Sequence, residues 1–242
     1  MGTKAQSFRF APVNSIVERL KTLGNKTAAE HAQRFFKTGP GEYGEGDIFL
    51  GIKVPVLRKL AKEHRDIALS EAVELLQSPF HEVRLTALLI MVLQYERGEN
   101  RTTIYRAYLA NTHRINNWDL VDVTAAQIVG AHLFERERKP LYRLAKSKSL
   151  WERRIAIIAT LYFIRRAQFA DTLAIADILL NDKEDLMHKA VGWMLREVGK
   201  RDLEVEEQFL IPRYKQMPRT MLRYAIERFP EPKRLAYLKG RI

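Results

Sequence analysis

The chain has 242 residues, of which 46% are hydrophobic and 29% charged, a globular composition that excludes a disordered protein. Lys and Arg number 41 against 29 Asp and Glu, and the formal charge of +12 favours a polyanionic partner, nucleic acid before an anionic membrane surface, although a merely soluble basic surface is the alternative. The absence of cysteine excludes disulfides and thiolate chemistry and is compatible with a reducing cytosol.

The first ten residues, MGTKAQSFRF, contain no apolar signal core, and Gln6 does not fit the pattern for N-terminal myristoylation. No uninterrupted apolar run approaches the roughly 20 residues that a membrane-spanning helix needs. We therefore expect a soluble, intracellular protein.

Helical periodicity of apolar residues dominates the sequence, and no convincing alternating strand is found. Pro55 fits the first turn of a helix, and Pro218 restarts the chain before the last one. Residues 38–52 hold five of the twelve glycines and are predicted to form one long irregular loop, which either contacts a ligand or joins the N-terminal helices to the repeats. The predicted helices cover residues 13–23, 26–37, 55–65, 69–77, 80–96, 101–112, 117–134, 139–146, 150–167, 170–180, 184–200, 203–217 and 219–228.

The sequence repeats itself at intervals of 38, 32, 35 and 34 residues, and at each repeat a polar residue opens a similar apolar, helix-forming segment. A recurrence of this length is typical of a helical solenoid, in which equivalent positions of successive repeats line up on one surface. We predict an all-α, right-handed helical solenoid with a concave basic face, formed by residues 1–242 as a single domain. The five polar residues are Arg84, Asp122, Arg154, Lys189 and Arg223.

The one acid in this row belongs to a segment that starts at Asn116 and reads Asn-Asn-Trp-Asp-Leu-Val-Asp. Asparagine favours the position before a helix, so Trp118 and Asp122, four residues apart, should lie on neighbouring turns of one helix face. The alternative is structural: Trp118 packs in the core, and Asp122 pairs with a basic residue of an adjacent repeat. The candidates for that partner are Arg84 and Arg154.

A second tryptophan, Trp193, lies in the predicted helix over residues 184–200. Helical spacing places Lys189, Arg196 and Lys200 on the same stripe as this indole. A cationic stripe with an aromatic ring provides charge for phosphate and a flat surface for a nucleoside. The alternative is a half-buried tryptophan covered by the aliphatic stems of the lysines.

Arg153 and Arg154 fall in the first turn of a predicted helix, where the helix dipole disfavours cations by up to roughly 1 kcal/mol. This placement indicates an anion from outside the chain. A local ion pair with Glu152 is the alternative.

Several familiar kinds of site have no counterpart in the sequence. The six histidines are scattered without metal-ligand spacing, and no nucleophile-elbow serine motif is present. Residues 192–200 end in Gly-Lys but lack the glycine spacing of a phosphate loop. We expect neither a metal nor a nucleotide cofactor.

Four stretches that span most of the chain resemble, in the same order, a known family, the AlkD-type DNA alkylation repair glycosylases, which are monomeric HEAT-like repeat proteins. The stretches are Phe49–Ile52 with Pro55, Trp118–Asp122, Trp151–Arg154 and Lys189–Glu197.

The resemblance implies that Asp122 is the catalytic carboxylate and that Arg154 helps to hold the DNA. It implies that Trp118 and Trp193 contact the deoxyribose and backbone of the damaged nucleotide. The implied reaction is hydrolytic removal of cationic N3- or N7-alkylated purines from double-stranded DNA, without metal, cofactor or lyase activity. The implied protein is a cytoplasmic monomer, associated with the nucleoid when bound to DNA. Asn117 departs from the best-known members, which carry an aromatic residue there, and this difference bears on lesion range.

A mechanism follows from the charge of the damaged base. An alkylated purine cation is already a good leaving group, so one carboxylate suffices to stabilise the sugar as it becomes cationic and to orient water. Indole faces attract such a developing cation by up to about 2 kcal/mol. The basic members of the repeat row would bind phosphates without reading sequence. They are Arg84, Arg154, Lys189 and Arg223.

Two other functions stay open on the sequence. One is a non-catalytic module that binds damaged or branched DNA, which would never release free base. The other is a protein-interaction scaffold, the commonest use of helical solenoids, whose weak DNA binding would lack a steep salt dependence.

Overall fold

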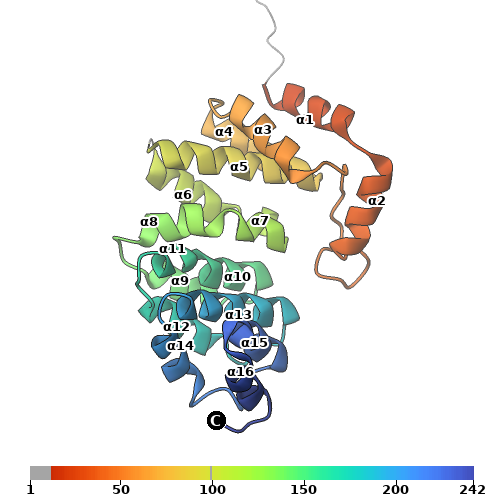
Figure 1. Ribbon diagram of the computed structural model, residues 1–242. Helices are drawn as coiled ribbons and strands as arrows, with labels where there is room; N and C mark the ends of the chain where they lie inside the picture. Colours follow the sequence, from red (N-terminus) through yellow and green to blue (C-terminus); the bar gives the residue numbers. More distant parts are fainter. Residues whose placement is uncertain (1–11, 99) are drawn as a thin grey trace, which may run out of the picture. The chain divides into compact units, whose positions relative to one another are not determined.

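The computed structural model describes residues 12–98 and 100–242, and these residues form helices joined by loops (Figure 1). In this described part, β-pairing is limited to an isolated bridge between Ile48 and Phe80. The prediction of an all-α, solenoid-like fold is confirmed, whereas its handedness and concave face stay predictions. The first ten residues, used above to predict the absence of a signal or lipid anchor, lie outside the described residues.

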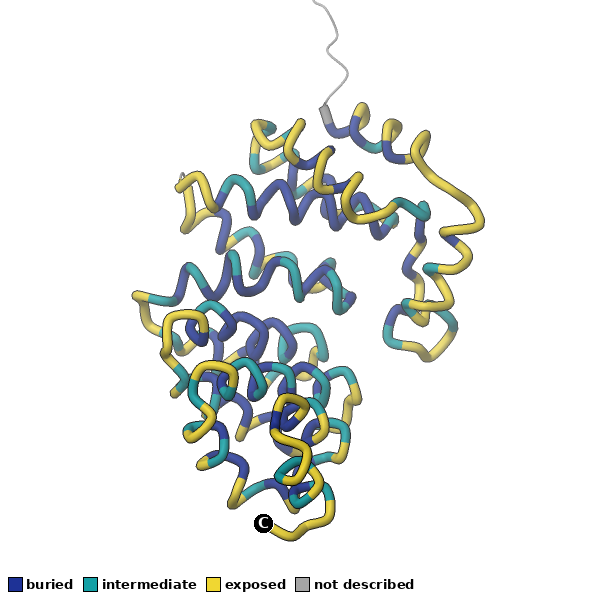
Figure 2. The backbone as a smooth tube through the Cα atoms, in the orientation of Figure 1, coloured by how far each residue is buried: buried dark blue, intermediate teal, exposed yellow. Residues whose placement is uncertain are grey.

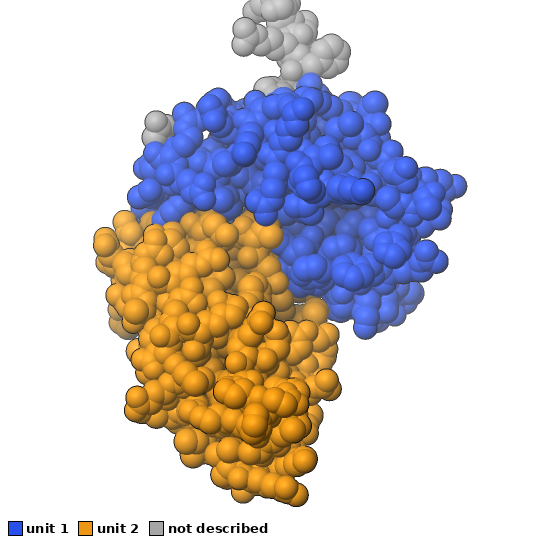
Figure 3. All heavy atoms as spheres, viewed as in Figure 1, with its two compact units in different colours: residues 1–120 blue, residues 121–242 orange. Residues whose placement is uncertain are grey.

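The chain divides into two compact units, residues 1–120 and 121–242, and the boundary falls inside a short helix, α7, Trp118–Asp122. Figure 3 shows the two units in different colours. The prediction of a single domain over the whole chain stays a prediction.

The first unit is built around α5, His81–Arg97, in which every residue from 81 to 92 is buried (Figure 2). A helix that is buried on all sides must be covered on all sides. Accordingly, α3, α4, α1 and α6 all pack against it. The other helices of this unit are α1 (Pro12–Leu23), α2 (Lys26–Phe35), α3 (Val54–Glu63), α4 (Leu69–Leu76), α6 (Arg101–Ala110) and a 3-10 turn, Thr112–Arg114.

The predicted irregular loop over residues 38–52 is confirmed, and its end is fixed to α5. The Glu82 carboxylate accepts hydrogen bonds from the backbone amides of residues 50–52, at 2.7–3.2 Å. Gly51 has a φ of +79°, and a Cβ there would lie 2.2 Å from the carbonyl oxygen of Asn25. Only glycine allows this approach, so this part of the loop joins α2 to α5.

In the second unit, α13, Asp185–Gly199, packs between α10, Leu150–Ala159, and α15, Arg219–Ala225. These three helices form one layer, and α9, α12 and α14 pack against that layer (Figure 1). The remaining elements are α9 (Lys139–Ala145), α11 (Leu161–Ile164), α12 (Ala170–Ile178), α14 (Leu203–Leu210), a 3-10 turn (Ile226–Arg228) and α16 (Glu231–Leu238).

Two glycines allow neighbouring helices of the second unit to approach one another. A Cβ on Gly192 would lie 2.4 Å from the carbonyl oxygen of Met221, and a Cβ on Gly130 would lie 2.2 Å from that of Ala159. Both distances are below van der Waals contact. Gly192, a small residue of the repeated pattern, is therefore a position where the backbones of α13 and α15 meet.

The repeat register is confirmed by the helices. Each of the five repeat-aligned residues is the fourth or fifth residue of its own helix. They are Arg84 in α5, Asp122 in α7, Arg154 in α10, Lys189 in α13 and Arg223 in α15.

The prediction of one continuous helix over residues 117–134 was wrong. The chain leaves helical geometry after Asp122, resumes as a π-helix over Ala126–Gly130 and ends as α8, Ala131–Leu133. Gly130, the last residue of the π-helix, packs against the backbone of α10. Periodicity detects a continuous apolar face but not such a local change in winding, which is common near functional sites.

Other helices also differ from the prediction. The helix predicted over residues 150–167 is divided into α10 and α11, and α11 ends at Ile164. Helix α14 ends at Leu210 rather than at 217, and the last helix, α16, was not predicted. Proline is well tolerated in the first helical turn, where its missing N–H has no intrahelical partner, and Pro232 occupies that place in α16. The three prolines at 218, 230 and 232 therefore mark helix starts.

Candidate functional site

Trp118, half-buried at the start of α7, is the end of a column of stacked rings in the first unit. Its indole stacks on Phe36, with centroids 5.2 Å apart and planes at 15°. Phe36 stacks on Phe49 at 4.8 Å, and Phe49 stacks on His81 at 4.3 Å. The exposed ring of Phe35 meets the indole edge-on at 6.1 Å. One face of Trp118 is thus occupied by Phe36, so the tryptophan is neither fully in the core nor free on both faces.

The column ends on a buried histidine between two carboxylates. His81 Nδ1 lies 3.0 Å from Asp47 Oδ2, and Nε2 lies 2.8 Å from Asp119 Oδ2. Burial alone would lower the pKa of His81, but the hydrogen bonds and charges of Asp119 and Asp47 outweigh it and raise the pKa to about 9. Burial raises the pKa of Asp47, but His81 and Arg84 together lower it to about 2. An imidazolium therefore connects the glycine-rich loop to the first turn of α7.

Arg84 and Asn117 belong to the same buried network. Arg84 is 2% exposed, and its guanidinium binds the Asp47 carboxylate and the carbonyl oxygens of Ser78 and Pro79. Asn117 is fully buried, donates to Asp47 and accepts from the amide of Trp118. These positions support neither the predicted binding of phosphate by Arg84 nor a contact between Asn117 and a lesion.

In the second unit, Asp122 and Arg154 form a bidentate ion pair. Arg154 Nε and Nη2 each donate to one Asp122 carboxylate oxygen at 2.8 Å, and Nη1 donates to the carbonyl oxygen of Leu186 at 2.6 Å. The Arg154 side chain is 6% exposed and that of Asp122 is 15% exposed. The structural alternative considered from sequence, an ion pair across repeats, is present, yet the carboxylate still reaches solvent.

Arg153 forms a second pair of the same kind. Its Nε lies 2.6 Å from Asp182 Oδ2 and its Nη2 lies 3.3 Å from Oδ1. Glu152 instead accepts a hydrogen bond from the hydroxyl of Ser147. The prediction that Arg153 and Arg154 bind an anion from outside the chain is therefore corrected, because Arg153 binds Asp182 and Arg154 binds Asp122.

The predicted stripe on α13 is present, but its cations carry acidic partners. Trp193 is half-buried, and its indole N–H donates to Glu197 at 3.3 Å. Lys189 pairs with Asp185 at 2.7 Å, and Lys200 pairs with Glu197. Arg196 pairs with Glu227 of the following repeat. In the next repeat, Arg223 is exposed.

Sequence reasoning missed Asp47, His81 and Asp119, although one signal was available. His81 and Asp119 are 38 residues apart, the same interval that separates Arg84 from Asp122. Equivalent positions of adjacent repeats lie side by side in a solenoid. The histidine and the acid could therefore have been predicted as neighbours. Phe35 and Phe36 carried no such signal, because α2 lies outside the repeats.

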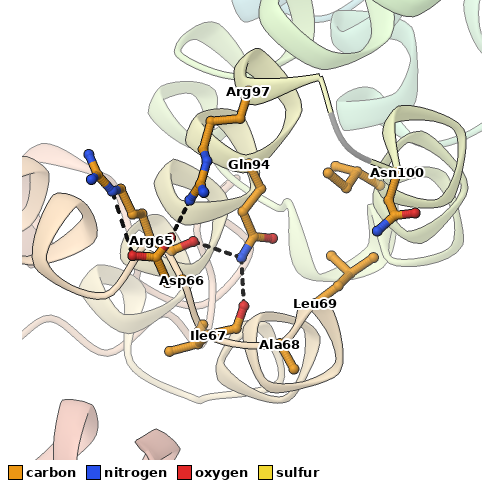
Figure 4. Close-up of a pocket in the computed structure, with 9 residues that line it drawn as sticks. Arg65, Asp66, Ile67, Ala68, Leu69, Gln94, Arg97 and Asn100 are labelled. Atoms are coloured by element: carbon orange, nitrogen blue, oxygen red, sulfur yellow. Dashed lines mark hydrogen bonds and ion pairs between the residues drawn. The ribbon is translucent and has the colours of Figure 1, made fainter.

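A cavity of about 310 Å³ in the first unit is lined by Arg65, Asp66, Gln94 and Arg97 among others. There Gln94 donates to the carbonyl oxygens of Arg65 and Ile67, and Asp66 binds Arg97 (Figure 4). Its charged groups satisfy one another and indicate no ligand.

The described residues offer neither a metal-binding cluster nor a membrane-spanning helix. Among the residues that the structure describes, no group of three or more His, Cys, Asp or Glu side chains could hold a metal ion. None of the helices in that part of the chain is both long and apolar enough to cross a bilayer.

Comparison with known proteins identifies a family and a solved structure with a similar fold. The family model described as DNA alkylation repair enzyme matches residues 16–229. A solved structure described as a predicted DNA alkylation repair enzyme from Enterococcus faecalis superposes with a TM-score of 0.66 at 17% identity, covering 86% of this chain and 97% of its own. At this identity the likeness shows the fold alone. Among curated proteins, none matched the sequence.

Proposed function

Because the chain belongs to the DNA alkylation repair enzyme family, we propose that it is a monofunctional DNA glycosylase that hydrolyses the glycosidic bond of positively charged alkylated purines, such as 3-methyladenine and 7-methylguanine. The observation that carries this proposal is the Asp122 carboxylate, which is held by Arg154 and remains 15% exposed. A carboxylate with fixed orientation and access to solvent is the group that the reaction requires.

The ion pair with Arg154 orients Asp122 without enclosing it, because the carboxylate side chain remains 15% exposed. A carboxylate has about four lone-pair sites, and the two hydrogen bonds from Arg154 use one on each oxygen. The guanidinium fixes the plane of the carboxylate through two parallel hydrogen bonds. Arg154 is thus proposed as a positioning residue for Asp122, in place of the DNA contact expected from sequence.

The proposed reaction is a hydrolysis at C1′ of the damaged nucleotide. The glycosidic bond breaks with its electron pair going to the alkylpurine, which leaves as a neutral base. A water molecule bound by Asp122 forms the new C1′–O bond, and its proton passes to the carboxylate. The negative charge of Asp122 stabilises the cationic sugar during this exchange.

Trp118 and Trp193 are proposed to contact the deoxyribose and its backbone. Trp118 precedes Asp122 by one turn of α7, and its stack on Phe36 fixes the orientation of the indole. Trp193 is half-buried on α13, on the stripe that Lys189, Arg196 and Lys200 share. Partly exposed indole faces attract developing positive charge, which favours the sugar cation over the neutral sugar.

The test is release of free base. Duplex DNA treated with a methylating agent is incubated with the protein, and the supernatant is analysed for 3-methyladenine and 7-methylguanine by chromatography. Release by the parent protein and loss of release in Asp122→Asn support the proposal. Binding of the same DNA without any release would contradict it.

One observation favours a second candidate, a non-catalytic protein that binds damaged DNA. Both oxygens of Asp122 already accept hydrogen bonds from Arg154, which offsets the negative charge that catalysis needs. In that case methylated duplex would be bound more tightly than unmodified duplex while no base appears in solution.

A further inference from the structure

The repeat-aligned cations of the second unit are for the most part neutralised. Arg154 is buried against Asp122, and Lys189 pairs with Asp185. A cation whose charge is offset by an adjacent carboxylate releases few counterions when a phosphate approaches. The row that the sequence singles out is therefore a weak phosphate-binding surface.

A second row of cations follows the same repeat in the loops that lead into α10, α13 and α15. Lys148 and Lys183 each lie two residues before their helix, and Arg219 is the first residue of α15. The intervals between them are 35 and 36 residues. All three are exposed, and in the described part of the chain none of the three forms an ion pair at 4 Å or less. We name the loops over residues 146–149, 181–184 and 215–219 the loop edge.

Side-chain contacts of Arg153 place the first two loops next to each other. Arg153 donates to the carbonyl oxygens of Ser147 and Lys148 at 3.1 and 2.9 Å, and the same guanidinium binds Asp182 at 2.6 Å. One partly buried cation thus joins the loop before α10 to the loop before α13. His188 also contacts the carbonyl oxygen of Asp182 at 2.6 Å, which holds that loop against α13.

The third loop is adjacent to the second. The side chain of Asp185, in the first turn of α13, hydrogen-bonds to Thr220, in the first turn of α15. Lys183 and Arg219 are within two residues of this contact. Three exposed cations from successive repeats therefore lie along one edge, each held by a fixed backbone.

The charge balance of the loop edge is positive. Two acids in or next to these loops are already paired with cations of the same chain, because Asp182 binds Arg153 and Asp185 binds Lys189. Glu184 is the exposed acid among these loops. The basic residues along the same loops are Lys146, Lys148, Lys183, Lys215 and Arg219.

We propose that the loop edge is a phosphate-contacting surface of the second unit and that Lys148, Lys183 and Arg219 bind successive phosphates of one DNA strand. This inference rests on the proposed function for its ligand, duplex DNA, but not on base excision. Exposed point charges on fixed loops bind backbone without reading bases.

The experiment compares two triple variants of the whole chain by binding to an unmodified duplex of about 20 base pairs at a series of salt concentrations. The edge variant carries Lys148→Gln, Lys183→Gln and Arg219→Gln. The control removes the same charge beyond the opposite, carboxyl ends of helices in the same unit. It carries Arg136→Gln, Arg165→Gln and Arg166→Gln, which are exposed residues.

Charges at the two ends of the helices should act independently, because the ends lie far apart compared with the screening length. Helix α13 has 15 residues and is about 22 Å long, whereas charges are screened over about 8–10 Å at physiological salt. Each lost phosphate contact should lower the slope of log K against log salt by about 0.9. The edge variant is therefore expected to lose roughly two to three units of slope and 10²-fold or more of affinity at low salt, and the control less than one unit.

Equal losses of affinity in the two variants, or an unchanged salt slope in the edge variant, would refute phosphate binding by the loop edge. The outcomes below distinguish this result from a failure of the proposed glycosylase function. A parent protein that binds DNA through the edge but releases no methylated base leaves the edge standing and refutes the glycosylase. A parent with no salt-dependent binding refutes both. Circular dichroism of each variant shows that the fold is kept.

Discussion

The pair of Asp122 with Arg154 leads to a prediction that separates a catalytic acid from a structural one. Asp122→Asn keeps the size of the side chain but removes its charge, so the buried guanidinium of Arg154 loses its counterion. Asp182→Asn makes the same change in the pair with Arg153, whose two side chains are 16% and 6% exposed. In both pairs Nε and Nη2 of an arginine bind the two oxygens of a largely buried carboxylate, and only Asp122 is proposed to act in catalysis.

The magnitude of the stability loss follows from burial. Removing one partner from a buried ion pair costs about 3–5 kcal/mol, and the remaining amide oxygen of Asn recovers part of this, which leaves about 2–4 kcal/mol. For a chain of this length, that loss corresponds to a decrease in Tm of roughly 5–15 °C. Both variants should show a decrease in this range.

The catalytic effect should differ between the two. Loss of a single electrostatic stabiliser lowers a rate by about 10²-fold or more. Single-turnover release of 7-methylguanine is measured at 20 °C, below the transition of either variant, with the unfolding midpoint recorded on the same samples. At protein concentrations that saturate the DNA, so that weaker binding at the loop edge does not limit the rate, Asp122→Asn is expected to lose at least 10²-fold and Asp182→Asn less than threefold. If both variants lose activity in proportion to stability, Asp122 is a structural partner of Arg154 and the catalytic assignment fails.

Three further predictions concern stability. Because the folded pKa of His81 is about 9 against 6.5 unfolded, its contribution is complete below pH 6.5 and is lost as pH rises through 9, so the unfolding free energy should fall by about 3 kcal/mol over that range. In His81→Gln, denaturant titrations at each pH should lack this fall; an equal fall in the variant contradicts the assignment. Burial raises the pKa of Glu206 to about 9 against 4.5 unfolded, so the free energy of unfolding should fall as pH rises from 4.5 to 9. Glu206→Gln should therefore be more stable than the parent at pH 8 by about 2–3 kcal/mol, after the cost of burying an amide. A lower Tm of the variant at pH 8 would refute a neutral, buried Glu206. Gly192→Ala should lower Tm by roughly 5–10 °C, because its Cβ would meet the backbone of α15 at 2.4 Å, and an unchanged Tm would show that the helices separate easily.

Much of the fold could be predicted because the information is local and periodic. The repeat at 32–38 residues and the 3.6-residue period of apolar side chains identify helices that must stack, and the five repeat-aligned residues fall at equivalent helix positions. The glycine-rich loop follows from backbone freedom alone. The π-helix at residues 126–130 does not follow, because it depends on how closely Gly130 packs against α10.

The candidate site was likewise predictable only in part. Sequence identified Asp122, Trp118 and Trp193 as residues of interest, because a charge or an indole at an unusual place in a helix is visible in a one-dimensional pattern. It could not decide what each side chain faces. Arg84 and Arg154 occupy the same repeat position as exposed Arg223, yet both are buried against carboxylates.

The sequence by itself determined that this chain forms tandem helices, carries excess positive charge and places an acid in a basic row. Only the tertiary structure decided which charges are neutralised. An ion pair such as Arg154 with Asp122 joins residues 32 apart, and its existence depends on the packing of neighbouring helices. Pairing energy and desolvation are set by the three-dimensional surroundings of a charge, whereas a sequence pattern records only the order of residues.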